Sequence, residues 1–319
     1  MILITGGLGY LGGRIAKYLL NSGERVRVAS RRSATKFELE KLNDCEFVAI
    51  NLLDRDSLEA ACHGVKSIVH LGAMNAKDSE ERPDEALMVN GLGSLKLIES
   101  AIKKNVKNFL YFSTVHIYGF PLKGVISEST VPRPLHPYSI THRIAEDYVL
   151  QANSDTLING MVFRISNAVG SPLHKNTNCW NLVANDLCKQ TVINNKMLIK
   201  SNKFIQRDYI PISMICDITH QFITGKCVST SGENIFNISS GISMGLNDLT
   251  QLISDLAFEL FNKKPAVEFL GNNSKVNIEL SISRSKLNMN KCLADVDIYD
   301  EIKELLLNCK RWFVSDNKK

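Results

Sequence analysis

The 319-residue sequence lacks the features of a membrane or secreted protein. No run of about 18 apolar residues is present, so a spanning helix is not expected. Residues 1–5 read MILIT, which is typical of a buried strand, and they carry no basic leader of a signal peptide. We therefore expect a cytoplasmic protein with no membrane partner.

Cysteines at the spacing of a zinc site or a redox motif are also missing. The eight cysteines are widely spaced, with no C-x-x-C pair and no Cys/His group at zinc spacing. A disulfide framework is excluded and no metal site is expected. Free thiols in a reducing compartment are the simplest interpretation.

Charge of one sign is scarce too. The 38 basic and 33 acidic residues leave a net charge of +5. Lys and Arg are scattered, whereas a nucleic-acid binder would cluster them on one element. No nucleic-acid partner is expected, although the mild excess fits a small molecule that carries phosphates.

What the sequence does have is an alternation of short apolar runs with longer helical patterns, in a chain that is 44% hydrophobic and 22% charged. Strands are predicted at residues 2–4, 25–29, 47–50, 67–71, 109–113 and 161–165. Helices are predicted at residues 14–22, 57–62, 84–104, 144–151 (opening near Tyr138), 246–261 and 302–312. This alternation predicts an α/β fold with a doubly wound parallel sheet and a ligand crevice at the carboxyl ends of its strands.

A glycine-rich turn, TGGLGYLG at residues 5–12, follows the first strand and opens a helix. Gly6, Gly9 and Gly12 leave no Cβ where the chain turns and where a pyrophosphate must approach the backbone. The helix N-terminus then offers free N–H groups to the phosphate. Residues 1–166 are therefore predicted to be a Rossmann-like dinucleotide-binding domain, to which some later segments return. Residues 167–319 are predicted to form mainly a smaller substrate-binding domain.

The end of the second predicted strand bears on the choice of dinucleotide. It reads Ser30-Arg31-Arg32, without the carboxylate that holds an adenosine ribose. Ser30 and either arginine can bind a 2′-phosphate, which favours NADP over NAD. The alternative is that both arginines are ordinary surface charges. Asn51 and Leu52 are expected near the adenine, and Asp54 as a helix cap.

Beyond the glycine turn, several ordered motifs resemble the extended short-chain dehydrogenase/reductase family, in particular its nucleotide-sugar epimerase/dehydratase branch. They are IVHLGA at 68–73, MVNGLGS at 88–94, FSTVHIYG at 112–119, PYSITHRIAEDY at 137–148, FRISNAVGSP at 163–172 and QRDYIPI at 206–212. The resemblance covers residues 1 to about 240. It implies an NAD(P)-dependent enzyme acting on a nucleotide-activated sugar, in the service of polysaccharide synthesis.

The resemblance also implies site residues. Thr114 would hydrogen-bond the sugar oxygen at which hydride chemistry occurs, and Tyr138 would be the general acid/base. The cofactor-binding set is Gly6, Gly9, Tyr10, Leu11, Gly12, Ser30, Arg31, Arg32, Asn51, Leu52, Leu71, Gly72, Ala73, Met74, Asn90, Tyr138, His142 and Ile165. A homodimer through residues 84–104 and 140–151 is implied, with Leu87, Leu95, Ile98 and Ile102 as an apolar stripe that can equally pack on the sheet.

One departure from the family concerns the residue four positions after Tyr138. It is His142 instead of the family's lysine. A neutral imidazole can hold a ribose hydroxyl but stabilises a phenolate less than an ammonium does. Three outcomes stay open: an active enzyme, a slow enzyme that retains its cofactor, or a cofactor-binding protein without turnover.

A second departure follows Thr114 directly. Val115-His116 stands where dehydratases of the family place an Asp-Glu pair, so dehydration and decarboxylation are not expected. His116 is either a second acid/base or a buried, sugar-binding histidine. A keto-sugar reductase or dehydrogenase is the main prediction. A 4-epimerase with tightly bound NAD, a reductase of a non-nucleotide ketone and a non-catalytic module are the alternatives.

On the substrate side, Asn167 and Arg207 match family positions that meet the sugar nucleotide. Arg207 can instead form an ion pair with Asp208 or Asp217. Pro211 replaces the usual histidine, and residues 271–275 lack the family's second phosphate-binding arginine, for which Lys275 or Arg284 can substitute.

Overall fold

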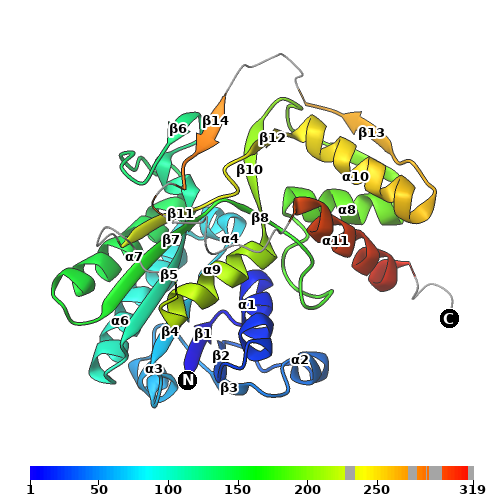
Figure 1. Ribbon diagram of the computed structural model, residues 1–319. Helices are drawn as coiled ribbons and strands as arrows, with labels where there is room; N and C mark the ends of the chain where they lie inside the picture. The colour runs from blue at the N-terminus through cyan, green and yellow to red at the C-terminus, as the bar shows by residue number, and fades with distance from the viewer. Residues whose placement is uncertain (227–233, 272–278, 285, 287–296, 315–319) are drawn as a thin grey trace.

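The computed structural model describes residues 1–226, 234–271, 279–284, 286 and 297–314. Its centre is a seven-stranded sheet in the order β11-β7-β5-β4-β1-β2-β3 (Figure 1). All its neighbouring strands pair in parallel. The strands are β1 (Ile2–Thr5), β2 (Val26–Ser30), β3 (Glu46–Ala49), β4 (Ser67–His70), β5 (Asn108–Thr114), β7 (Asn159–Ile165) and β11 (Ile235–Ile238). The predicted doubly wound parallel sheet is confirmed.

Helices cover both faces of this sheet, which explains why its central strands are apolar throughout. The helices of this part are α1 (Tyr10–Asn21), α2 (Lys36–Lys41), α3 (Arg55–Cys62), α4 (Ala76–Glu81), α5 (Pro83–Ala86), α6 (Gly93–Lys103), α7 (Pro137–Ser154) and α9 (Ile212–Thr224). α1 and α9 pack on one face, and α3, α6 and α7 pack on the other. β11 and α9 therefore join this layer from the second half of the chain.

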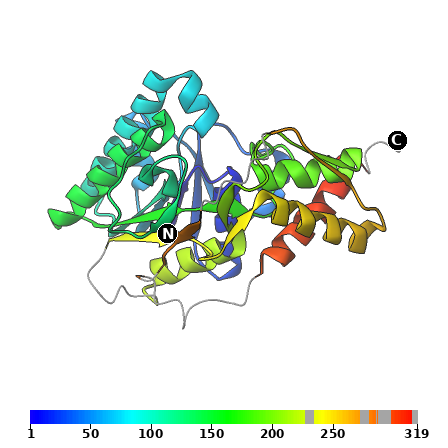
Figure 2. The same ribbon diagram turned by 90° about the horizontal axis from the view of Figure 1, so that it is seen from above.

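The remaining helices form a separate lobe, which Figure 2 shows beside the sheet. They are α8 (Val183–Asn194), α10 (Leu246–Phe261) and α11 (Ile298–Phe313). Their buried residues, such as Leu187, Ile253 and Leu305, form one apolar core. The shorter strands are β6 (Gly124–Ile126), β8 (Asn167–Val169), β9 (Lys196–Ile199), β10 (Gln206–Pro211), β12 (Ser243–Gly245), β13 (Ala266–Phe269) and β14 (Leu280–Ile282).

Three predicted helices differ from the structure, and one of them, α11, begins at Ile298, four positions before its predicted start at residue 302. α1 begins at Tyr10, four positions before the predicted start at Arg14, because the glycine turn itself forms its first turn. The predicted helix at residues 84–104 is interrupted by a π-helical turn, η1 (Leu87–Leu92), between α5 and α6. This π-helical turn contains Asn90, whose side chain forms hydrogen bonds with Met74 and Thr141 outside the turn. π-helical turns of this kind often occur at functional sites.

Three further observations concern the described residues only. Cys45, Cys62, Cys179, Cys188, Cys216 and Cys309 are free thiols, whereas Cys227 and Cys292 lie outside the described residues. No helix among those described is long and apolar enough to cross a membrane. The same part of the chain contains no group of three or more His, Cys, Asp or Glu residues able to hold a metal ion.

Candidate active site

The glycine turn fits a pyrophosphate in its backbone geometry. Gly6 has a φ of +67°, and a Cβ on Gly12 would lie 2.3 Å from the carbonyl oxygen of Gly6. Gly9 is the N-cap of α1 and places no side chain over the helix N-terminus. The first backbone N–H groups of α1 therefore stay available to an anion, as a dinucleotide requires. Leu11 packs against the core of the sheet, so its backbone alone faces the turn.

Tyr10, predicted beside the cofactor, turns its ring toward the other lobe. Its hydroxyl donates to the carbonyl of Gly170 at 2.9 Å and to Oδ1 of Asn185 at 3.1 Å. The side chain thus links α1 to α8, and only its backbone N–H belongs to the phosphate turn.

The two arginines after β2 are not equivalent. Arg32 holds the buried carboxylate of Glu38 with two hydrogen bonds of 2.5 and 2.8 Å. Burial opposes ionisation of this carboxyl, but hydrogen bonds from Arg32 and Thr35 lower the pKa of Glu38 to about 2. Arg31 is exposed, and Ser30 accepts a hydrogen bond from the backbone N–H of Arg32. Only one of the two arginines is therefore free for a 2′-phosphate.

The two residues predicted to lie near the adenine, which follow β3, also differ from each other in their exposure. Asn51 is exposed, and its Oδ1 accepts the backbone N–H of Leu53 at 3.0 Å. Leu52 is buried in the core, close to Gly93, so its side chain packs under α6 instead of facing the crevice. Asp54 caps α3, as expected, by accepting from the N–H of Asp56.

Asn90 links the loop after β4 to the start of α7. Its Oδ1 accepts the backbone N–H of Met74 at 2.7 Å, and its Nδ2 donates to Oγ1 of Thr141 at 3.0 Å. Thr141 in turn donates to the carbonyl of Tyr138. Leu71 and Gly72 lie against Gly6, so the predicted residues 71–74 border the glycine turn. The buried amide of Asn90 thus holds this loop and Tyr138 in one framework.

A row of buried polar side chains crosses the carboxyl ends of β1, β4 and β5. The strand register places Thr5 beside His70 and His70 beside Tyr111. His70 Nδ1 lies 2.6 Å from Oγ1 of Thr5, and its Nε2 lies 2.9 Å from Oγ of Ser94. Burial lowers the pKa of His70 to about 3, with a contribution from His142. His70 is therefore a neutral histidine of the core.

Tyr138 and His142 lie in contact one turn apart on α7, with ring centroids separated by 4.3 Å. Burial raises the pKa of Tyr138 to about 12 and lowers the pKa of His142 to about 3. The imidazole is therefore neutral, so it places no positive charge beside the phenol. Its Nδ1 lies 2.5 Å from the hydroxyl of Tyr111.

The second ring nitrogen of His142 supports the fit of a dinucleotide. Nε2 is buried and has no hydrogen-bond partner among the described residues. Leaving such a group unpaired costs about 1–3 kcal/mol, which a ligand hydroxyl can recover. The glycine turn and this nitrogen together fit a cofactor that carries both a pyrophosphate and a ribose.

Thr114 ends β5 opposite Ile165 of β7, and α7 packs against this strand. Its Oγ1 accepts the backbone N–H of His116, which opens the short helix η2 (Val115–Tyr118). Burial, together with Arg207 and His136, lowers the pKa of His116 to about 4. Thr114 and His116, which lie two residues apart, are thus on the side of the crevice that holds Arg207 of β10.

Asn167 and Arg207 meet on the three-stranded sheet β12-β10-β8. Asn167 donates through Nδ2 to the backbone carbonyl of Asp208. The expected alternative for Arg207 does not form: Asp208 accepts from Ser166, Ser240 and Gly241, and Asp217 accepts from Tyr18 and Gln221. In the described part of the chain, Arg207 makes no hydrogen bond or ion pair.

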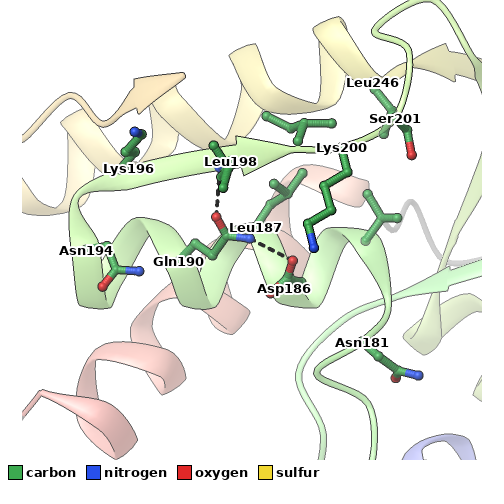
Figure 3. A pocket seen from close by; sticks show the side chains of 12 residues that line it. Asn181, Asp186, Leu187, Gln190, Asn194, Lys196, Leu198, Lys200, Ser201 and Leu246 are labelled. Atoms are coloured by element: carbon green, nitrogen blue, oxygen red, sulfur yellow. Dashed lines mark hydrogen bonds between the residues drawn. The ribbon is translucent and has the colours of Figure 1, made fainter. Parts of the chain in front are cut away.

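A pocket of about 640 Å³ lies between α8, β9 and the start of α10 (Figure 3). Gln190 bridges Asp186 and the backbone of Leu198, while Lys200 extends from the end of β9 toward α8. None of the predicted site residues lines it. α10 begins directly after β12, whose Met244 pairs with Arg207. Lys275 lies outside the described residues, whereas Arg284 lies against Gly241.

Tyr111 and the pocket residues are absent from the predicted site. A tyrosine inside the apolar run FLYF is the only sequence signal for the first. Its partner, His142, is brought to it only by the register of the strands and the packing of α7. The pocket combines α8, β9 and the start of α10, of which only α10 was predicted, and these elements meet only through tertiary packing.

Comparison with protein-family models identifies the chain. Residues 2–239 match the NAD dependent epimerase/dehydratase family, and the chain belongs to this family. The predicted resemblance is confirmed.

Several relatives have defined activities. The GDP-6-deoxy-D-talose 4-dehydrogenase of Aggregatibacter actinomycetemcomitans is 26% identical over 287 residues, which cover 86% of this chain and 89% of the relative. The UDP-glucose 4-epimerase of Caenorhabditis elegans is 26% identical over 329 residues, covering 90% and 91%. The UDP-glucose 4-epimerase of Haemophilus influenzae is 28% identical over 181 residues, covering 53% and 54%. The chain thus spans about half the length of this and other relatives it matches.

Solved structures share the fold over nearly the whole chain. The UDP-glucose 4-epimerase of Thermus thermophilus in complex with NAD has a TM-score of 0.80 at 22% identity, covering 98% of this chain and 99% of that one. The UDP-glucuronic acid 4-epimerase from Bacillus cereus in complex with NAD has a TM-score of 0.81 at 19% identity, covering 97% and 96%.

Proposed function

We propose that the protein is an NAD-dependent 4-epimerase of a nucleotide sugar. The observation that carries this proposal is the Tyr138–His142 pair. A buried phenol lies against a neutral imidazole with an unpartnered nitrogen, at the sheet edge that also holds the glycine turn. An epimerase oxidises a carbinol to a keto sugar and reduces it from the opposite face.

Each site residue has a role in this reaction. In its phenolate form, Tyr138 takes the proton of the sugar hydroxyl during oxidation, and the resulting phenol returns this proton during reduction. The raised pKa of the buried phenol must therefore fall when cofactor and substrate bind. Thr114 hydrogen-bonds the same oxygen, and His142 Nε2 binds a ribose hydroxyl of the cofactor. The bound nicotinamide supplies the hydride acceptor and then the hydride donor.

Two observations support epimerisation over the keto-sugar reduction that the sequence favours. Several relatives are UDP-glucose 4-epimerases. Val115 and His116 stand in place of an acid pair, and His116 is neutral, which fits a reaction without elimination of water. A 4-dehydrogenase is the second candidate, because the alignment with the GDP-6-deoxy-D-talose enzyme spans most of both chains.

NAD is the better-supported cofactor. Solved relatives of the same fold hold NAD. The engagement of Arg32 by Glu38 also weakens the arginine pair on which the NADP prediction depends. Arg31 and Ser30 alone would have to bind a 2′-phosphate.

The substrate's nucleotide is assigned to the side of the crevice with Arg207. An unpaired guanidinium is suited to diphosphate oxygens. The adjoining pocket beside Lys200 has the volume of a small-ligand site. Asn167, held by β10, lies on the same small sheet.

A homodimer through η1 and α7 remains part of the proposal. Leu87, Met88 and Ile140 are 49%, 44% and 42% exposed, whereas Ile98 is buried against the sheet. The predicted apolar stripe is therefore divided between the core and an outer face. A cytoplasmic location and a role in polysaccharide synthesis complete the proposal.

The test begins with the cofactor that co-purifies, identified after denaturation by chromatography. The protein is then incubated, without added cofactor, with UDP-, GDP-, CDP- and dTDP-sugars, and the products are separated. An epimerase interconverts two epimers to equilibrium with no net NADH. In a parallel incubation with added NAD or NADPH, a dehydrogenase or reductase consumes the cofactor stoichiometrically. Bound NAD with no conversion of any sugar in either incubation would contradict catalysis.

A further inference from the structure

We propose that Tyr111 is a positioning residue that donates its phenolic proton to Nδ1 of His142 and so holds the imidazole as the Nε2–H tautomer. The inference rests on the proposed function, since it assigns His142 the place at which relatives carry a lysine. Tyr111 replaces no family catalytic group and does not touch the reacting atoms.

The donors and acceptors available to Tyr111 and His142 set the direction of the hydrogen bond between them. The Tyr111 hydroxyl is buried and has one proton to donate, and His142 Nδ1 at 2.5 Å is its only partner among the described residues. If Nδ1 carried the ring proton, the phenolic proton would be buried without an acceptor, at a cost of about 1–3 kcal/mol. With Tyr111 as donor, both groups are satisfied and the ring proton resides on Nε2.

The environment keeps the imidazole neutral and the phenol protonated. Burial lowers the pKa of His142 and raises the pKa of Tyr111 well above its ordinary value. The ionisable groups around the pair are His70 on β4, Tyr138 on α7 and Glu146 on α7. Glu146 is itself paired with Arg164 at 2.7 Å, so its charge is compensated.

The consequence is a fixed neutral donor where the family has a cation. Nε2–H can donate to a cofactor hydroxyl or to the Tyr138 phenolate, whereas the other tautomer would present a lone pair, which can accept from a hydroxyl but would repel the phenolate. The Tyr111–His142 pair therefore supplies an N–H donor of fixed direction, although it supplies no positive charge. A lysine at position 142 would need no such partner, because all three of its ammonium protons are donors.

The first test reads the tautomer without turnover. ¹⁵N spectra of histidine-labelled protein distinguish protonated from unprotonated ring nitrogens, and His142→Gln assigns the signal among the seven histidines. We expect wild-type Nδ1 to be unprotonated and Nε2 protonated, and Tyr111→Phe to shift the signal toward a mixture. Protonated Nδ1 in the wild type would overturn the proposal.

The second test is a double-mutant cycle on turnover. Tyr111→Phe is expected to lower kcat about 10- to 100-fold in the wild-type background, the range for partners that orient a functional histidine, with little change in substrate KM. In the His142→Lys background the same substitution should cost no more than about twofold. Equal losses in both backgrounds would show that Tyr111 acts only through packing.

Tyr18→Phe is the matched control. It removes a hydroxyl that donates to Asp217 at 3.0 Å, far from α7 in the sequence, and should change neither signal nor kcat. The spectra also separate this inference from the proposed function. A wild-type Nε2–H tautomer that depends on Tyr111 supports the pair even if no sugar is converted, and a reactive enzyme with the opposite tautomer contradicts the pair alone.

Discussion

The polar side chains on the two sides of the crevice differ in whether they are hydrogen-bonded. On the side of β1, β4, β5 and α7, the buried row from Thr5 to Tyr111 is hydrogen-bonded, and His142 Nε2 is left open. On the side of β9 and β10, Lys200 and Arg207 make no hydrogen bond or ion pair in the described part of the chain. We therefore expect the first side to carry out the chemistry and the second side to have its cations neutralised by a substrate.

The largest test of this contrast is Tyr138→Phe. Removing the phenolic proton should lower kcat by about 10²- to 10⁴-fold, the usual contribution of a general acid/base, while the bound cofactor is retained. Turnover and cofactor content of the purified variant measure both effects. Tyr148→Phe on the same helix should behave as wild type, and unchanged turnover in Tyr138→Phe would remove that residue from the mechanism.

Arg207→Ala should act mainly on binding. Loss of a hydrogen bond to a charged group costs about 1.5–3 kcal/mol, which is roughly a 10- to 100-fold rise in KM. Steady-state kinetics with the identified nucleotide sugar separates KM from kcat. Arg207→Lys keeps the positive charge but loses the planar guanidinium, so its KM should fall between those of the wild type and Arg207→Ala. A loss confined to kcat would instead assign Arg207 to the chemical step.

The Arg32–Glu38 pair tests whether the first side is held by its polar bonds. Because the folded-state pKa of Glu38 is about 2, below the usual 4.5, its contribution is present above pH about 4.5 and is lost as pH falls through about 2. Glu38→Gln should lower the free energy of unfolding at pH 7 by about 1.5–3 kcal/mol. Denaturant titrations should show this difference shrinking in acid, and the exposed Glu40→Gln should show none at any pH.

The smallest expected effect concerns cofactor choice. Glu38→Gln removes the charge that holds Arg32 and should raise the affinity for NADP relative to NAD by about 3- to 10-fold, within the range of one charge-assisted bond. Competitive titration of the stripped protein with both dinucleotides measures the ratio. An unchanged ratio would mean that Arg32 does not reach the 2′-position.

Much of the chemical side could be predicted because it depends on local pattern. The glycine spacing requires a turn with no Cβ, and the four-residue spacing of Tyr138 and His142 places them on one helix face. The partner of His142 could not be predicted, since Tyr111 reaches it only through the register of β4 with β5 and the packing of α7. The partner of Arg32 could not be predicted either, because it is Glu38, which the capping box at Thr35 holds in place.

The recognition side could not be predicted at all beyond Asn167 and Arg207. Its pocket combines α8, β9 and the start of α10, and although the helix at residues 246–261 was predicted, α8 and β9 were not. The wide turn at Asn90 was also missed, because a π-helical turn needs tertiary hydrogen bonds to Met74 and Thr141 to be stable.

By itself, then, the order of residues determined the parallel sheet, the phosphate turn and the spacing of phenol and imidazole, because these depend on backbone sterics and on neighbours within one turn or strand. Only the folded chain decided which nitrogen of His142 meets Tyr111, which arginine stays free and where the pocket beside Lys200 lies. Each of these depends on hydrogen bonds between residues far apart in the sequence, and such bonds exist only after the strands have aligned and the helices have packed.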